Sequence, residues 1–146
     1  MEILQLYGGA TINNSQISGQ VNAGAFGSKD IILYNGEIDQ VHLSNGGKCI
    51  INGGIVNKIR LGSNYGNINL TIGNINENVN NNDPQIKEIQ IETGDLAGIT
   101  AIINFYNGII QKGYYGDDDS GYYGEFNLRP GYKAQTTADG TILVKQ

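Results

Sequence analysis

Residues 112–126, KGYYGDDDSGYYGEF, hold the side chains of this chain that are best suited to bind a ligand. Two GYYG segments flank three consecutive aspartates, so carboxylates stand beside aromatic rings. Carboxylates bind cations or accept hydrogen bonds from sugar hydroxyls, and tyrosine rings pack on sugar faces or fill interfaces between subunits. The candidate contact residues of this segment are Tyr114, Tyr115, Asp117, Asp119, Tyr122 and Tyr123.

The aspartates do not have the spacing of a helix–loop–helix calcium site. That loop places oxygen ligands at alternate positions, a glycine at the sixth position and a glutamate at the twelfth. Counted from Asp117, the sixth residue is Tyr122 and the twelfth is Leu128. We therefore predict no metal and no cofactor, with an irregular calcium site at Asp117 and Asp119 as the alternative.

Three interpretations of the role of these tyrosines remain open. They could bind a glycan, although the chain has no tryptophan, or they could lie on the two strands of a hairpin whose turn is GDDDSG. The third reading is a contact between subunits, because tyrosine brings a large apolar area and a hydroxyl group to an interface. Four of the chain's nine tyrosines stand here, and we predict a subunit contact.

The composition of the chain predicts an all-β fold. Its 146 residues suit a single domain, 1–146, while 22 glycines and many asparagines disfavour helices and favour turns. The net charge of −5 provides no basic field for nucleic acid, and no apolar run approaches the roughly 20 residues that cross a bilayer. We expect no nucleic-acid partner and no membrane partner.

A repeat of 18 residues dominates the middle of the chain. GEIDQVHL (36–43) aligns with GIVNKIRL (54–61), and the preceding apolar pairs 32–33 and 50–51 align at the same offset. The apolar spacing recurs in Ile86, Ile89 and Ile91, and a weaker copy begins at Gly19. Such units are typical of a parallel β-solenoid, in which stacked coils bury one another's apolar faces. An antiparallel β-sandwich or jelly roll is the alternative.

This alignment argues against catalysis. It stacks His42 over Arg60 and then Gln90 in an outward column, and it pairs Asp39 with Asn57 and Glu37 with Ile55, so no column of carboxylates forms for glycoside hydrolysis. Cys49 and His42 are the only residues of their kinds, and nothing in the sequence places them together as a nucleophile and its base. We predict that the protein is not an enzyme and that Cys49 is a core residue.

The repeats divide the domain into three parts. Residues 1–75 form the predicted solenoid coils, although their register weakens after Gly62, and residues 76–85, NENVNNNDPQ, form an exposed Asn-rich loop. Residues 86–146 provide further strands and end in an antiparallel hairpin that caps the solenoid. Its predicted turn is Asp139-Gly140, followed by a strand from Thr141 to Lys145.

NGEIDQVHLSNGG (35–47) and NGGIVNKIRLGSNYG (52–66) resemble coils in the β-solenoid segments of bacteriophage fibre, spike and decoration proteins and of bacterial adhesins. The resemblance implies a structural or receptor-facing role in a homo-oligomer, with a trimer among the options, and no transferable catalytic residues. The start, MEILQLYGG, lacks the features of a secretory signal, so we expect a virion protein assembled in the host cytoplasm beside other virion proteins. The alternative is a carbohydrate-binding module or an adhesin that is secreted or displayed on a cell surface.

Overall fold

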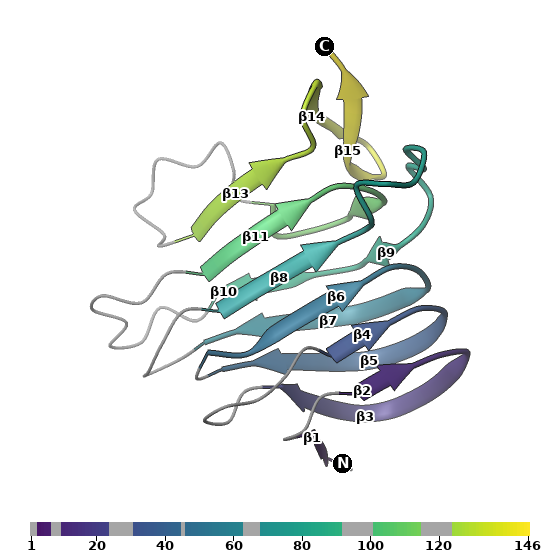
Figure 1. Ribbon diagram of the computed structural model, residues 1–146, viewed down its shortest axis with the longest axis vertical. Helices are drawn as coiled ribbons and strands as arrows, with labels where there is room; N and C mark the ends of the chain where they lie inside the picture. Colours follow the sequence, from purple (N-terminus) through teal and green to yellow (C-terminus); the bar gives the residue numbers. More distant parts are fainter. Residues whose placement is uncertain are drawn as a thin grey trace.

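A computed structural model of the protein shows a β-solenoid built from two sheets (Figure 1). It describes residues 3–6, 10–23, 31–44, 46–62, 68–91, 101–114 and 124–146. Within these ranges the chain forms strands and turns and no helix. Along most of the chain, successive strands alternate between the sheets, so that each turn of the chain adds one level to both. The predicted all-β solenoid is confirmed.

We call the two sheets sheet A and sheet B. Sheet A has nine strands: β1 (Ile3–Leu6), β3 (Ser15–Ala23), β5 (Gly36–Leu43), β7 (Ile55–Leu61), β9 (Gln85–Ile86), β10 (Ile89–Ile91), β12 (Ile109–Ile110), β14 (Tyr132–Thr137) and β15 (Gly140–Lys145). Sheet B has six strands: β2 (Ala10–Ile12), β4 (Ile31–Leu33), β6 (Lys48–Ile51), β8 (Ile68–Ile72), β11 (Ala101–Phe105) and β13 (Gly124–Leu128). Neighbouring strands run parallel except at the C-terminal hairpin.

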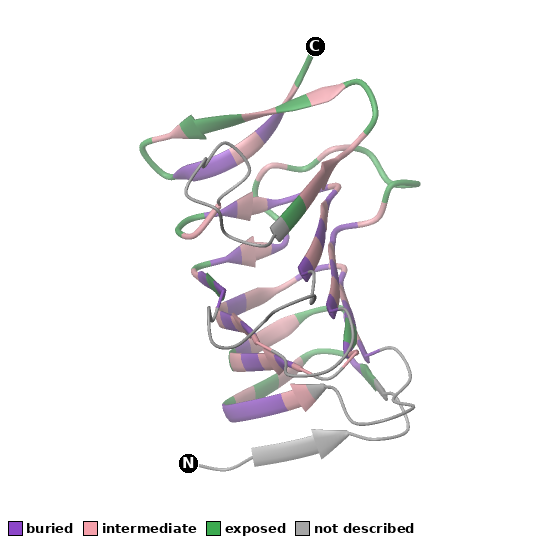
Figure 2. Cartoon of the chain, turned by 90° about the vertical axis from the view of Figure 1, so that its left-hand side faces the viewer, coloured by how far each residue is buried: buried purple, intermediate pink, exposed green. Residues whose placement is uncertain are grey.

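The core consists of apolar columns that run from coil to coil between the sheets. In sheet A, Val41 lies opposite Ile59, and Ile59 lies opposite Ile89. In sheet B, Leu33 lies opposite Ile51, and Ile51 lies opposite Ile72. All six of these inward side chains are almost fully buried. Buried positions recur along the strands of both sheets in Figure 2. The predicted offset of 18 residues is confirmed between β4 and β6 and between β5 and β7.

Two parts of the structure depart from the predicted repeat. The earlier copy begins at Ser15, which lies opposite Gly36, and not at Gly19. A β-bulge between Ile17 and Gln20 shifts the register within this strand, and a simple alignment of two sequences does not reveal such a shift. The parallel stack also continues beyond residue 75, because β11 pairs with β8 and β13 pairs with β11.

The Asn-rich loop is exposed along most of its length but is tied to the solenoid. Buried Asn107 accepts a hydrogen bond from the backbone N–H of Asn80 and donates one to the carbonyl of Asn78 at 3.0 Å. Pro84 is buried, in contrast to the expectation that almost nothing in this loop would be. The loop is thus an insertion between two coils that leaves their stacking intact.

The C-terminal hairpin forms the last two strands of sheet A. Strand β15 pairs antiparallel with β12, which puts Ile142 opposite Ile109, and β14 pairs with β15. The predicted cap is therefore confirmed, but its two-residue turn is Ala138-Asp139, one residue earlier than expected, since Thr137 lies opposite Gly140. Gly140 has a φ of +138° and begins β15 as a strand residue.

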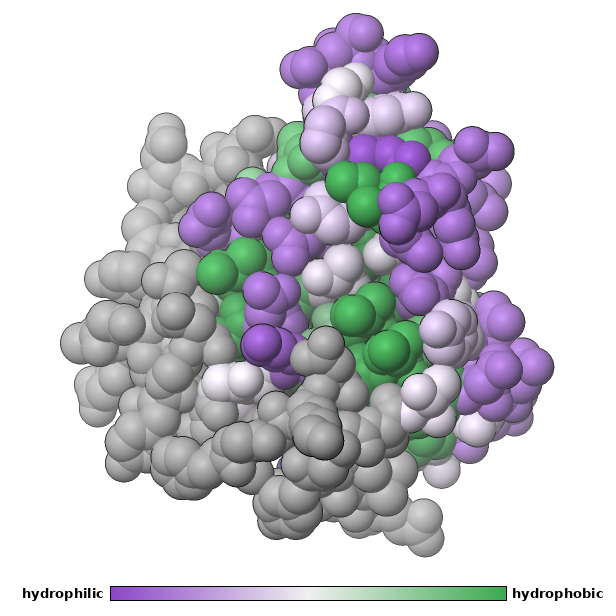
Figure 3. All heavy atoms as spheres, in the orientation of Figure 1, coloured by the Kyte–Doolittle hydropathy of each residue, from purple (hydrophilic) through white to green (hydrophobic). Residues whose placement is uncertain are grey.

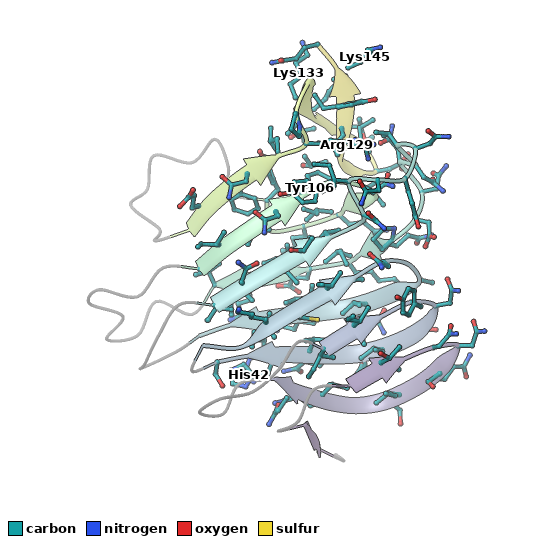
Figure 4. The ribbon with its side chains drawn as sticks, viewed as in Figure 1. His42, Tyr106, Arg129, Lys133 and Lys145 are labelled. Carbon is teal, nitrogen blue, oxygen red and sulfur yellow. The ribbon has the colours of Figure 1, made fainter. Side chains whose placement is uncertain are left out.

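Arg129 joins the hairpin to the insertion. Its Nη1 donates to the carbonyl of Tyr106 at 3.1 Å, and its Nη2 donates to the carbonyl of Glu77. The guanidinium also lies over the ring of Tyr132, 5.5 Å from the centroid. Figure 4 shows Arg129 and Tyr106 beside each other below the hairpin.

Gly54 tests how closely the coils approach, with Gly131 as its matched control. Both have a positive φ, +88° and +83°, but a Cβ at Gly54 would lie 2.5 Å from the carbonyl oxygen of Gly36, whereas a Cβ at Gly131 would meet nothing within 4 Å. We expect Gly131→Ala to lower the free energy of unfolding by about 1–2 kcal/mol. Gly54→Ala should lower it by about 3 kcal/mol or more, because the backbone must also shift. Equal losses in urea unfolding would contradict the close contact.

Candidate functional site

The described surface holds an open polar groove beside the bulge of β3. Its volume is about 460 Å³, and it is lined by Gln16, Ile17, Ser18, Glu37, Asp39 and Asn57. Glu37 and Asp39 stand two residues apart on β5 and therefore point to the same outward side of sheet A. Asn57 lies on β7, one coil further along. The bulge changes the direction of β3 locally and so shapes one wall of the groove.

Asn57 links the two carboxylates of the groove. Its Nδ2 donates to Glu37 Oε1 at 3.3 Å and to Asp39 Oδ1 at 3.4 Å, both long contacts. Its Oδ1 is buried and accepts no hydrogen bond from the described residues. The groove therefore presents carboxylate, amide and hydroxyl groups that can exchange hydrogen bonds with a hydroxyl-rich ligand. It offers no described aromatic ring on which a sugar could stack.

The outward column predicted on sheet A is confirmed. His42 lies opposite Arg60, and Arg60 lies opposite Gln90, while Asn22 precedes His42 in the same column. His42 and Arg60 are half-buried, and Figure 4 shows His42 near the end of β5.

Cys49 is 1% exposed and points into the core from sheet B, between Ile31 and Leu70. Since His42 faces outward from the opposite sheet, the two residues do not form a nucleophile and base pair.

An amide ladder runs along the outward side of sheet B. Asn104 Nδ2 donates to Asn69 Oδ1 at 3.1 Å and to Thr71 Oγ1 at 3.2 Å. Asn127 Nδ2 donates to Asn104 Oδ1 at 3.0 Å, so the ladder crosses β8, β11 and β13. Polar and apolar residues are interspersed on this side of the molecule in Figure 3. The ladder fixes the register of the last coils, and it was not predicted from the sequence.

Only one residue of the predicted tyrosine and aspartate site belongs to the described part of the chain. Tyr114 is half-buried, and its ring packs edge-on against Phe126 at 4.7 Å and near Phe105 at 6.4 Å. Tyr115, Asp117, Asp119, Tyr122 and Tyr123 lie outside the described residues. Residues 111–114 form no strand and β13 pairs in parallel with β11, while the predicted GDDDSG turn lies outside the described residues.

The groove residues Glu37, Asp39 and Asn57 were not predicted to form a site, for a geometric reason. The alignment compared positions in adjacent coils and correctly placed Glu37 beside Ile55, so it found no column of carboxylates. Two carboxylates on one strand can also share a face and accept hydrogen bonds from an amide of the next coil, which a comparison of aligned positions does not show. The alternation of β5 was the signal that could have revealed them.

Comparisons with protein family models, with curated proteins and with solved structures each found no match. Among the described residues, no group of three or more His, Cys, Asp and Glu side chains is placed to hold a metal ion. The same part of the chain contains no helix long and apolar enough to span a membrane.

Calcium tests whether the aspartates of residues 117–119, or Glu37 and Asp39, form a cation site. We expect that adding millimolar calcium, or EDTA, leaves the Tm unchanged, because neither set has the ligand spacing of a calcium loop. A ligand that binds only the folded state raises its stability, so a rise of several degrees with calcium would contradict the expectation. Magnesium at the same ionic strength is the control.

Proposed function

We propose that this protein is a non-enzymatic structural or attachment protein that acts as a homo-oligomer, of the kind found in bacteriophage fibres, spikes and decoration proteins. The observation that carries this proposal is the asymmetry of the stack. At its C-terminal end, sheet A ends in an antiparallel hairpin whose outer strand, β14, carries mostly polar side chains and includes Lys133, a charge of the kind that protects edge strands. At its N-terminal end, β1 and β2 each have one ladder partner among the described residues, so their outer edges are open there.

An open edge favours association. Unpaired N–H and C=O groups along a strand readily pair with another chain, and a symmetric oligomer can cover such edges with copies of itself. The rest of the described chain is a stack of short coils whose apolar columns are internal. A stack whose first strands, β1 and β2, can pair with another chain suits a module that is built into a larger assembly.

Thr11 provides a test of this edge. The carbonyl of Ile12 accepts a hydrogen bond from Tyr34 N–H at 2.9 Å, so Ile12 faces β4 and the backbone of Thr11 faces the outer edge. Thr11→Pro removes only the outward donor, and Thr11→Ala is the matched control. In light scattering at tens of micromolar, we expect wild type and Thr11→Ala to exceed the monomer mass of 15.7 kDa. Thr11→Pro should shift toward that mass, and a monomeric wild type would refute the oligomer.

Carbohydrate binding is a second candidate function, and the polar groove favours it. If a glycan binds there, substituting Glu37→Gln and Asp39→Asn together should weaken binding at least about tenfold, because charged acceptors make the stronger hydrogen bonds. Glycan-array screening followed by calorimetry with any glycan found would measure the change. Glu125→Gln, an exposed change on the other sheet, is the control and should have no effect. Equal binding by all variants would exclude the groove.

A further inference from the structure

The two sheets end differently at the C-terminal end of the stack. Sheet A continues past β12 with β15 and β14, whereas sheet B stops at β13. In Figure 1 the hairpin rises above β13. Within the described residues the only ladder partner of β13 is β11, so its second edge is unpaired. The hairpin therefore extends sheet A alone, and β13 keeps an edge that no described strand pairs with.

The inward side chains of β13 are incompletely buried. Ile103 and Phe105 on β11 are both 0% exposed, because β8 and β13 cover them from two sides. Their neighbours in the same columns, Phe126 and Leu128, are half-buried although they pack against the core. Apolar side chains at the matching positions of β8 and β11 are buried, whereas those of β13 remain partly in contact with water at this edge. One more strand would bury them.

The backbone of β13 is turned to receive that strand. Arg129 N–H donates to the carbonyl of Phe105 at 3.1 Å, so the alternation of a parallel ladder directs Asn127 and Glu125 toward β11. The N–H and C=O groups of Phe126 and Leu128 then point to the open edge. Asn127 is also the last member of the amide ladder, and its carboxamide oxygen can accept a hydrogen bond from the next position.

The space at this edge suits a single extended segment. A second solenoid stacked on β13 would need to place its sheet A where β15 and β14 already lie. The described strands of a second copy that keep an unpaired edge, such as β1 and β2, each belong to a whole solenoid, which would have to fit beside the hairpin. A strand supplied by a different polypeptide avoids both obstacles, since it can add to sheet B beside the hairpin.

We propose that the outer edge of β13 is a strand-acceptor site for an extended segment of a different protein, which adds parallel to β13. The segment has apolar side chains at alternate positions, which cover Phe126 and Leu128, and Asn, Thr or Ser between them to extend the amide ladder. Backbone hydrogen bonds provide the affinity, and the alternating side chains provide the register. The site rests on the geometry of β13 and does not depend on the proposed oligomer, which uses the opposite end of the stack.

The probe is a fluorescein-labelled peptide, AIINFYN, which copies residues 101–107 and therefore has the side-chain pattern that already pairs with β13. The control peptide, AINIFYN, has the same composition with the alternation broken. In fluorescence anisotropy, we expect AIINFYN to bind the full chain and the control to bind at least about tenfold more weakly, because a slip by one residue turns the side chains to the wrong face.

Four variants locate the site. Leu128→Pro removes the outward N–H donor, and Leu128→Ala removes the same side chain but keeps the donor, so the proline variant should bind about fivefold more weakly than the alanine variant. Asn127→Ala should bind about threefold more weakly than wild type, and Glu125→Ala should bind equally. Circular dichroism shows whether each variant is folded. If Leu128→Pro does not fold, the binding of Asn127→Ala still tests the site.

Equal binding of the two peptides, no binding to wild type, or binding that none of the β13 variants weakens would overturn the site. Self-association of the wild type that Leu128→Pro abolishes would identify a second copy as the occupant and overturn the assignment to a different protein. Thr11→Pro tests the oligomer at the N-terminal edge, whereas the β13 variants test peptide binding at the other end of the stack. The proposed function and this site can therefore fail independently, and the two failures give different results.

Discussion

The parallel register between coils is the constraint on which the rest of the structure depends. Neighbouring strands lie about 4.8 Å apart, so each coil has room for one side chain in each inward column. Val41, Ile59 and Ile89 fill one such column and are almost completely buried. No coil can bury its own apolar face, and the stability of each therefore depends on its neighbours. The glycine corners, the bulge and the insertion are all placed where they do not interrupt these columns.

The repeat could be predicted because the inward columns leave a direct trace in the sequence. Ile38, Val41 and Leu43 recur as Val56, Ile59 and Leu61, and the same spacing returns after the insertion. Features that depend on local backbone shape were harder to predict. Because of the bulge in β3, the first repeat begins at Ser15 and not at the predicted Gly19. The hairpin turn lies one residue earlier than the Asp-Gly pair suggested.

The candidate sites were less predictable than the fold because they depend on side chains that meet across coils. The groove combines two carboxylates of β5 with Asn57 from β7, and the amide ladder joins Asn69, Asn104 and Asn127 across 58 residues of sequence. Neither pattern forms a motif along the chain. Only Tyr114 of the predicted contact segment lies in the described part, where it packs against the aromatic end of the core. The ends and outer faces of the stack therefore carry the functional proposals, while the columns explain the fold.

Methyl-resolved nuclear Overhauser spectroscopy tests the register most directly. With isoleucine and valine methyl groups labelled, the account predicts cross-peaks between Val41 and Ile59 and between Ile59 and Ile89, which lie opposite each other in adjacent strands. Val41 and Ile89 should give no cross-peak, because two strand spacings, about 10 Å, separate them. Strong contacts between Val41 and Ile89, or the absence of either predicted neighbour, would contradict the parallel stack.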